Sequence, residues 1–144
     1  MKIEIKIVET EEELQKTFDI RRKTFCGEQG IPEDEEFDKY DHDPTVEHVL
    51  LSEDGVAIGC ARILPIDGKL KIERISLLIE YRGKGYGKAL VAWLADYCKA
   101  KNPEEIYINA QYYLEGFYEH LGFEKSGEPF EEGGVKHIKM IFKK

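Results

Sequence analysis

A glycine-rich turn between a predicted strand and a predicted helix constrains this chain more than any other feature. The segment EYRGKGYGKALVAWL, residues 80–94, places Gly83, Gly85 and Gly87 among three basic residues, directly before apolar residues with helical spacing. Glycine lets bare backbone approach a ligand, and the helix that follows supplies unpaired N–H groups and the positive end of its dipole. The turn therefore predicts a binding site for a phosphate group.

Three ligand classes use such turns, and the local pattern separates them in part. A nucleotide P-loop needs G-x-x-x-x-G-K-[ST], but the Gly-Lys pairs of this turn are followed by Gly85 and Ala89, which leaves no hydroxyl for Mg²⁺. A Rossmann turn needs G-x-G-x-x-G in a parallel β-α-β unit, whereas the spacing here is G-x-G-x-G. A coenzyme A pyrophosphate site and a plain turn with solvated lysines remain.

Hydrophobic periodicity predicts strands and helices in alternation. Ile3, Ile5 and Ile7 alternate with charged residues as in a half-buried strand, and Thr10 with Glu13 forms a capping box that opens a helix to about residue 25. An acidic, poorly periodic segment follows at 28–45. We expect an antiparallel meander of strands at 47–52, 56–64 and 70–79, joined by the hairpin signals EDG and IDGK. A long helix then ends at Asn102-Pro103, followed by a strand at 106–110, a short helix at 114–121, and strands at 123–126 and 137–142.

Length and composition exclude several classes of protein. A chain of 144 residues fits one domain, 1–144, and no stretch approaches the roughly 18 apolar residues of a membrane span, so we expect a cytoplasmic protein. The net charge of −8 argues against broad nucleic-acid binding. Three cysteines without CxxC spacing argue against a disulfide framework and a structural zinc site. We expect no metal, no membrane and no nucleic-acid partner.

Two motifs give the chain a family resemblance. R-G-K-G-Y-G at 82–87 resembles the R/Q-x-x-G-x-G/A signature of the GNAT N-acetyltransferase superfamily, and it follows the expected strand KIERISLLI. FYEHLGF at 117–123 resembles the second signature of that superfamily. RRKTFCGEQGIP at 21–32, INAQ at 108–111 and GGVKHIKM at 133–140 resemble, together with FYEHLGF and in the same order, the blocks of the ElaA-like branch.

The resemblance implies an α/β (α+β) fold with a mixed, mostly antiparallel central sheet that splays midway and is flanked by helices. Acetyl-CoA would lie in the splay, with its pantetheine arm along the backbone of the predicted strand and its pyrophosphate on the amides of the turn. Gln111 occupies the place where the family commonly has Asn, and Asn109 lies two residues earlier, so either amide would contact the pantetheine. The implied cofactor contacts are Ile75, Ser76, Leu77, Arg82, Gly83, Lys84, Gly85, Tyr86, Gly87, Lys88, Asn109 and Gln111.

The implied chemistry needs a neutral amine, a polarised thioester carbonyl and a protonated leaving thiolate. The resemblance places Tyr118 beside the sulfur, where a phenol hydroxyl would donate the proton. A backbone N–H near Leu77 would stabilise the tetrahedral oxyanion. Glu73, on the cofactor strand, would take the amine proton through water, or the amine would lose it to solvent without a dedicated base.

The acceptor site is expected where the first helix and the acidic segment close over the cleft. Arg21 falls on an apolar stripe of that helix, so it either pairs with an internal carboxylate or clamps an acidic substrate group. Residues 28–43 carry eight carboxylates against one lysine, and they either attract a cationic amine or form a solvated loop. Further candidates for this pocket are Glu28, Gln29, Asp38 and His48.

These observations predict an acetyl-CoA-dependent N-acetyltransferase that transfers the acetyl group directly to a primary amine in a ternary complex. The acceptor would be a small molecule or a peptide amine, and the family is often homodimeric. A CoA-binding sensor or scaffold without turnover is the alternative, and a mononucleotide-binding module is a more distant one.

Overall fold

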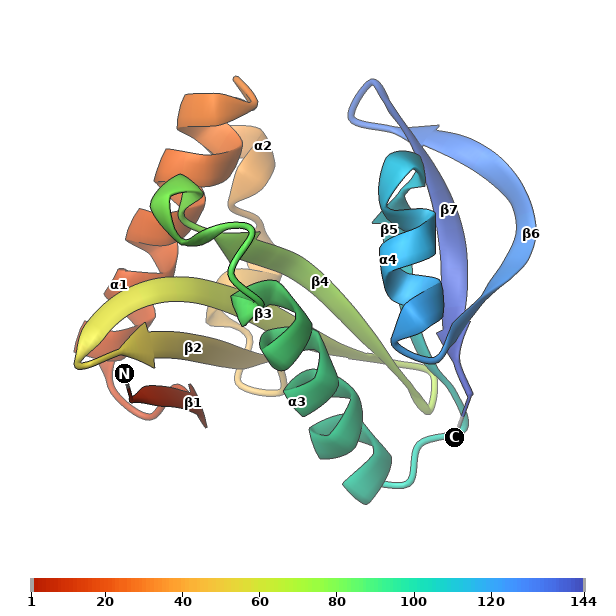
Figure 1. The fold of residues 1–144 in the computed structure, drawn as a ribbon, viewed down its shortest axis with the longest axis horizontal. Helices are drawn as coiled ribbons and strands as arrows, with labels where there is room; N and C mark the ends of the chain where they lie inside the picture. Colours follow the sequence, from red (N-terminus) through yellow and green to blue (C-terminus); the bar gives the residue numbers. More distant parts are fainter. Residues whose placement is uncertain (1, 144) are drawn as a thin grey trace.

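The fold is built on a seven-stranded sheet with helices on both faces (Figure 1). A computed structural model describes residues 2–143. The strand order is β1-β2-β3-β4-β5-β7-β6, and every neighbouring pair is antiparallel except β4 and β5. The mixed, mostly antiparallel sheet predicted from the sequence is therefore confirmed. The strands are β1 (Ile3–Ile7), β2 (Glu47–Glu53), β3 (Val56–Ile66), β4 (Lys69–Leu77), β5 (Ile106–Gln111), β6 (Phe123–Glu132) and β7 (Val135–Phe142).

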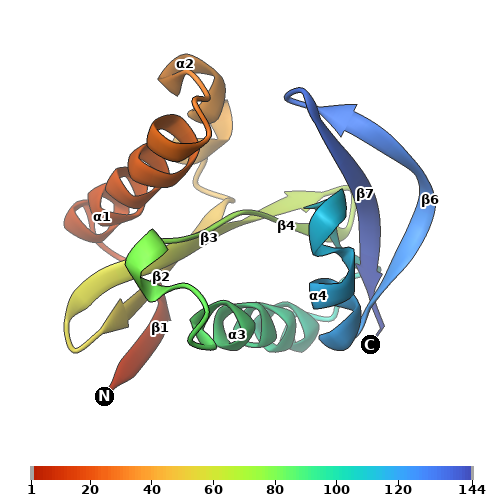
Figure 2. The ribbon, with the colours of Figure 1, turned by 45° about the horizontal axis from the view of Figure 1, so that its top comes forward.

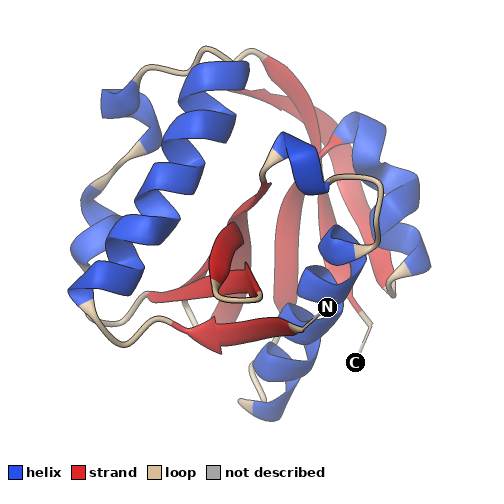
Figure 3. Ribbon diagram, turned by 60° about the vertical axis from the view of Figure 1, so that its left-hand side comes forward, coloured by secondary structure: helices blue, strands red, loops and turns tan. Residues whose placement is uncertain are grey.

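The helices divide between the two faces of the sheet (Figures 2 and 3). The α-helices are α1 (Glu11–Arg21), α2 (Glu33–Glu36), α3 (Tyr86–Ala100) and α4 (Glu115–His120), and the other helical segments are the π-helix η1 (Arg22–Glu28) and the 3-10 turns η2 (Lys39–His42), η3 (Ile79–Tyr81) and η4 (Tyr112–Leu114). Figure 2 shows α1 and α2 above β2–β4 and α3 below them. Within residues 2–143, no helix is long and apolar enough to cross a membrane.

Local sequence determines where the main helices begin. Thr10 and Glu13 form the predicted capping box of α1, because the Thr10 hydroxyl accepts from the Glu13 amide at 3.1 Å and the Glu13 carboxylate accepts from the Thr10 amide at 3.2 Å. Helix α3 begins instead directly after its N-cap Gly85, whose φ of +92° is a left-handed conformation that favours glycine. No side chain caps that helix.

The apolar core lies between the sheet and α3. Leu90, Leu94 and Cys98 recur at helical spacing on α3 and are fully buried against strand residues such as Ile63 and Ile72. Burying each leucine or isoleucine side chain contributes about 1.5–3 kcal/mol to stability. The opposite face of β2–β4 has only a small apolar cluster, formed by Ile20, Leu50 and Cys60.

The sheet opens between β4 and β5. These strands pair only where residues 70–72 face residues 106–108, although β4 continues to Leu77 and β5 to Gln111. Beyond the paired segment, β4 contains a bulge at Arg74, which has a φ of +56°, and its register with β3 shifts there. A bulge bends its strand, so β4 turns away from β5 and leaves the splay predicted from the family resemblance (Figure 1).

Several predicted boundaries were wrong. The first α-helix ends at Arg21 rather than near residue 25, because the chain continues as the π-helix η1. The acidic segment 28–45 contains the short helices α2 and η2. Strand β4 ends at Leu77 and residues 79–81 form a 3-10 turn. Strand β6 reaches Glu132 instead of residue 126, because a register shift between Ser126 and Phe130 lets the strand continue past Gly127 and Pro129.

Candidate active site

The turn from η3 to α3 presents a row of unpaired backbone amides. The N–H groups of residues 83–88 have no hydrogen-bond acceptor within the described part of the chain, and the first amide that does is Ala89, which donates to Gly85 at 3.1 Å. Gly83 and Gly85 have φ of +76° and +92°, and a Cβ at either position would meet no atom within 4 Å. Free amides beside open space, at the positive end of a 15-residue helix, can bind an anion.

Two lysines add positive charge to this turn. Lys84 and Lys88 form no ion pair with any carboxylate among residues 2–143, and the Lys84 ammonium lies 5.9 Å from the centre of the Tyr81 ring. Arg82 differs, because its Nε donates to the Leu77 carbonyl oxygen at 2.9 Å and its two terminal nitrogens donate to the Glu28 carboxylate at 2.8 and 2.9 Å. The lysines are therefore free for an anionic ligand, whereas Arg82 holds the turn against β4.

The open edge of β4 presents main-chain groups to the splay. The Leu78 amide donates to the Ile58 carbonyl oxygen of β3 at 2.9 Å. Main-chain groups alternate between the two edges of a strand, so those of Leu77 and Ile75 face the other way, toward the unpaired edge. Ser76 faces β3, and its hydroxyl lies 2.5 Å from that of Thr24. Of the three predicted strand contacts, Ile75 and Leu77 can thus bind an extended amide-bearing chain.

Asn109 and Gln111 lie together at the other side of the splay. Alternation along β5 buries Ile108 and Ala110 in the core and leaves the two amide side chains half-buried on the opposite face. Asn109 is paired across the sheet with Lys139, and Gln111 with His137. The structure therefore keeps both amides as candidates for the same ligand.

Tyr118 is a buried phenol without a hydrogen-bond partner among the described residues. Its side chain is 5% exposed and packs edge-on against Phe117 and Phe123. Burial, with a smaller contribution from Tyr113, raises the pKa of Tyr118 above its ordinary value. The hydroxyl is thus fully protonated at neutral pH, and it can donate a proton or a hydrogen bond to a bound group.

An ion network fills the space between α1, α2, η2 and the sheet. The Arg21 guanidinium donates to Asp41 at 2.6 Å and to Glu36 at 2.9 Å, and it is 1% exposed. Arg62 on β3, also 1% exposed, donates to the same Asp41 at 2.9 Å and to Asp38 at 2.8 Å. Burial alone would raise the pKa of Asp41, but Arg21 and the other partners lower it to about 2.

Glu73 belongs to this network. Its Oε2 accepts from Arg62 and its Oε1 lies 3.0 Å from the Lys71 ammonium. Burial would raise the pKa of Glu73, but Arg62 and Lys71 outweigh it, and the pKa falls below its ordinary value. A carboxylate stabilised in this way is a weak proton acceptor.

The network is balanced in formal charge. Arg74 completes it, with its Nε 3.1 Å from Glu36 and its Nη2 3.5 Å from Asp38. The four cations are Arg21, Arg62, Arg74 and Lys71, and the four anions are Glu36, Asp38, Asp41 and Glu73, so the formal sum is zero. The inward carboxylates of the acidic segment are therefore neutralised by arginines and do not form a free cation site.

The predicted acceptor residues occupy different places. Arg21 pairs with internal carboxylates, which is the first of its two predicted roles. His48 is buried, its Nε2 lies 3.1 Å from the Asp41 carbonyl oxygen, and burial lowers its pKa. Asp38 keeps 32% of its side chain exposed, Glu28 lies at the glycine turn, and Gln29 is exposed. Asp38 is thus the member of this set that combines exposure with a place in the network.

Sequence reasoning missed Arg62, Arg74 and Thr24. An arginine within the apolar strand sequence CARIL was a usable signal for Arg62, because a buried charge needs a partner. The bulge that carries Arg74 and the contact of Thr24 with Ser76 depend on strand register and helix docking, which no local pattern indicates.

Comparisons with known proteins agree with this arrangement. Residues 7–144 match the family model described as an acetyltransferase (GNAT) domain. The protein YyaT of Bacillus subtilis is 34% identical over 137 residues, which cover 94% of this chain and 93% of that protein. ElaA of Escherichia coli is 30% identical over 125 residues, which cover 84% of this chain and 81% of ElaA.

Solved structures share the fold. The crystal structure of Escherichia coli ElaA has a TM-score of 0.88 at 27% identity and covers 99% of this chain and 100% of that one. The PaiA N-acetyltransferase from Thermoplasma acidophilum, solved in complex with coenzyme A, has a TM-score of 0.70 at 19% identity and covers 96% of this chain and 98% of that one. At this identity the likeness shows a shared fold only. With a family model that matches nearly the whole chain and ElaA among its relatives, this protein belongs to the GNAT acetyltransferase family, in its ElaA-like branch.

Proposed function

We propose that this acetyltransferase uses acetyl-CoA to acetylate a primary amine directly, within a ternary complex. The observation that supports the proposal is that three features occur on elements that border one splay (Figure 1). These are an open strand edge at Ile75 and Leu77, free amides with two unpaired lysines at the start of α3, and a protonated phenol at Tyr118. An extended pantetheine arm, a pyrophosphate and a thioester require these three features in this order.

The residues of the chain would bind the donor in two ways. Main-chain groups of Ile75 and Leu77 would pair with the amides of the pantetheine arm as an added strand would. The N–H groups of residues 83–88, with Lys84 and Lys88, would hold the pyrophosphate. Asn109 or Gln111 would bind the arm from the β5 side, which would keep the thioester within the splay.

The transfer forms one C–N bond and breaks one C–S bond. The amine nitrogen attacks the thioester carbonyl, and a main-chain N–H near Leu77 stabilises the oxyanion, an interaction that typically lowers the barrier by several kcal/mol. As the tetrahedral species collapses, Tyr118 donates its proton to the leaving thiolate and regains one from solvent. The products are CoA thiol and an acetylamide, and the amine proton leaves to water.

The proton balance needs no dedicated carboxylate base. Glu73 is the base predicted from the sequence, but Arg62 and Lys71 bind both of its oxygens and lower its pKa. An alkylamine with an ordinary pKa of about 10.4 still forms some neutral amine at pH 7 to 8 by proton loss to solvent. We therefore assign Glu73 a positioning role in the network and favour solvent as the proton acceptor.

Two alternatives differ from this proposal in measurable ways. A CoA-binding sensor or scaffold would use the same splay but would not need a proton donor at Tyr118. A mononucleotide-binding module would use the glycine turn without the strand edge, and it would bind ATP as tightly as CoA. We expect CoA to bind more than tenfold tighter than ATP or NAD, because only CoA also occupies the edge of β4.

The proposed activity is tested by a panel of amines. The protein is incubated with acetyl-CoA and polyamines, amino sugars, aminoglycosides, amino acids or lysine peptides, while free thiol and acetylated product are both measured. At least one amine should yield thiol and acetylamide in equal amounts. Tight acetyl-CoA binding without turnover of any amine in the panel would favour the sensor or scaffold instead.

A small-molecule or peptide amine as acceptor, a cytoplasmic location and a homodimer stay predictions. The neutral network offers no excess of negative charge to select a polycation, which is why the panel includes amines that also carry a carboxylate.

A further inference from the structure

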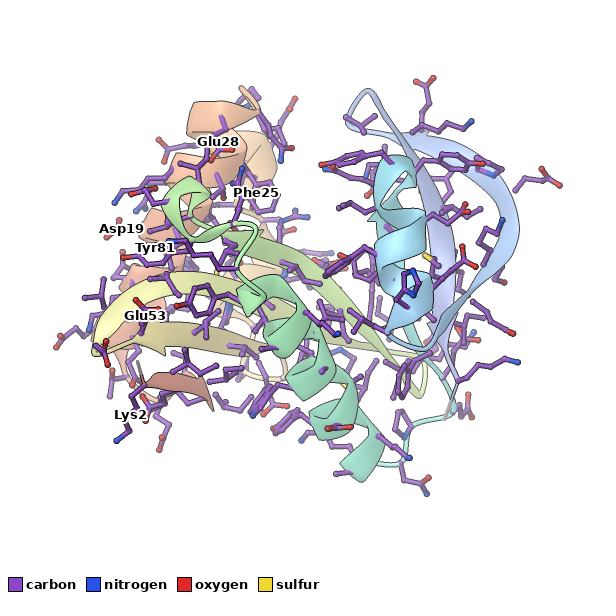
Figure 4. The ribbon with its side chains drawn as sticks, viewed as in Figure 1. Lys2, Asp19, Phe25, Glu28, Glu53 and Tyr81 are labelled. Carbon is purple, nitrogen blue, oxygen red and sulfur yellow. The ribbon has the colours of Figure 1, made fainter. Side chains whose placement is uncertain are left out.

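The π-helix η1 forms side-chain hydrogen bonds with the cofactor side of the fold at two points. The Thr24 hydroxyl donates to the Ile20 carbonyl oxygen at 3.0 Å and lies 2.5 Å from the Ser76 hydroxyl of β4. Four residues further along, Glu28 meets the glycine turn through Arg82. Figure 4 shows Glu28 and Tyr81 on the same side of the molecule, at the end of η1 and in the segment that leads to α3.

All three guanidinium nitrogens of Arg82 donate a hydrogen bond within the protein. Its Nη1 and Nη2 donate to the two oxygens of Glu28 at 2.8 and 2.9 Å, and its Nε donates to the Leu77 carbonyl oxygen at 2.9 Å. A bidentate pair of this kind fixes orientation as well as distance. One side chain thus joins three segments, which are the glycine turn, the open end of β4 and the last residue of η1.

We propose that Glu28 and Arg82 are positioning residues that couple the cofactor site to the acceptor side, so that binding of acetyl-CoA strengthens binding of the amine. The inference rests on the proposed function. Lys84 and Lys88 are the cations of the turn that form no ion pair within the described residues, so they meet the phosphate charge and Arg82 remains with Glu28.

The coupling follows from what each end of the link touches. A ligand held by residues 83–88 restricts the motion of the turn. Because Arg82 is paired with Glu28, the motion of the end of η1 is then restricted as well. From there the chain leads to α2, which ends at Glu36, and to Asp38, which caps η2, both on the acceptor side of the splay. Linkage is reciprocal, so an amine that orders this segment also strengthens cofactor binding.

Hydrogen exchange with mass spectrometry tests the link without knowledge of the amine. In the parent protein, CoA should slow exchange of residues 83–88 directly and slow exchange of residues 22–28 by about threefold or more through the link. Glu28→Gln should keep the first effect and lose the second, because a glutamine cannot accept from both terminal nitrogens. Arg82→Gln should do the same, since its amide still reaches the Leu77 carbonyl oxygen but cannot form the bidentate pair.

A matched control is available on the same segment. Arg22 of η1 pairs with Glu33 at 3.2 Å, with side chains 40% and 64% exposed, and this pair does not contact the glycine turn. Glu33→Gln removes the partner of an arginine that is 40% exposed, close to the 42% of Arg82, so it should preserve both exchange effects. Once an acceptor is known, Glu28→Gln should raise the KM for the amine about threefold to tenfold while the KM for acetyl-CoA changes by less.

Each result has a defined meaning. Protection of residues 22–28 that persists in Glu28→Gln, or that is lost equally in Glu33→Gln, would overturn the coupling. Tighter CoA binding in Glu28→Gln together with binding at least tenfold weaker in Arg82→Gln would overturn it too, because Arg82 would then be a phosphate ligand. Absence of protection at residues 83–88 in the parent would instead refute the cofactor site itself, and with it the inference.

Discussion

Replacing Gly85 with valine isolates the contribution of the glycine turn to cofactor binding. Gly85 has a φ of +92° and no atom within 4 Å of where its Cβ would stand, so a side chain there projects into the space assigned to the pyrophosphate. Gly55, in the β2–β3 hairpin, offers a matched control, because its φ is +84° and its Cβ would also meet nothing. Each substitution costs roughly 1–2 kcal/mol in backbone strain, but only Gly85→Val touches the predicted ligand.

The expected effect on binding follows from the hydrogen bonds lost. An amide that donates to a charged phosphate oxygen contributes about 1.5–3 kcal/mol, so losing one weakens CoA binding about 10- to 150-fold. At a CoA concentration of about 100 times the Kd of the parent, CoA stabilises the parent by about 2.7 kcal/mol. The same concentration should stabilise Gly85→Val by only about 0.3–1.4 kcal/mol.

Thermal unfolding with and without CoA measures this difference. Both variants should unfold a few degrees below the parent without ligand, and Gly55→Val should recover the full CoA-dependent shift whereas Gly85→Val should not. If CoA stabilises Gly85→Val as much as Gly55→Val, the turn does not hold the cofactor.

Two further predictions concern the ion network. Glu73→Gln should slow acetyl transfer less than tenfold per folded molecule, measured at saturating substrates. A general base would contribute about 10²- to 10⁴-fold, so a loss of rate in that range would show that Glu73 is the base. Asp41 has its pKa lowered to about 2 from an ordinary 3.8, so its stabilisation is complete above about pH 4 and is lost as the pH falls toward 2. Asp41→Asn should therefore be about 3–5 kcal/mol less stable than the parent at pH 7, because a buried ion pair loses one partner. In thermal scans from pH 5 to 2.5, the variant should lose less stability than the parent as the pH falls. Equal acid sensitivity of parent and variant would contradict that assignment.

The features that local sequence predicted well are those that local physics determines. The capping box at Thr10 and Glu13 and the glycine turn before α3 each depend on residues within a few positions of one another. The family resemblance added the splay, which local pattern alone does not indicate, since it arises where the bulge at Arg74 ends the pairing of β4 with β5.

The remaining features depend on contacts between distant parts of the chain. Arg62 pairs with Asp38 and Glu73 because of strand register and the docking of the acidic segment, so its partners lie 24 and 11 residues away. The π-helix η1 adopts its geometry where Thr24 and Glu28 meet β4 and the glycine turn. A sequence that shows only a run of carboxylates leaves both a cation site and a solvated loop open. In the fold, three of these carboxylates, Glu36, Asp38 and Asp41, neutralise buried arginines.

The central claim is that Tyr118 makes this splay an acetyltransferase site rather than a binding site. Tyr118→Phe removes one hydroxyl that has no hydrogen-bond partner in the described structure and keeps the ring that packs on Phe123. With an amine found in the panel, single-turnover transfer should slow by roughly 10²- to 10⁴-fold, while acetyl-CoA affinity measured by calorimetry changes less than about threefold. Transfer as fast as in the parent would contradict the assignment, and a loss of affinity in proportion to the rate would make Tyr118 a cofactor contact instead of the acid.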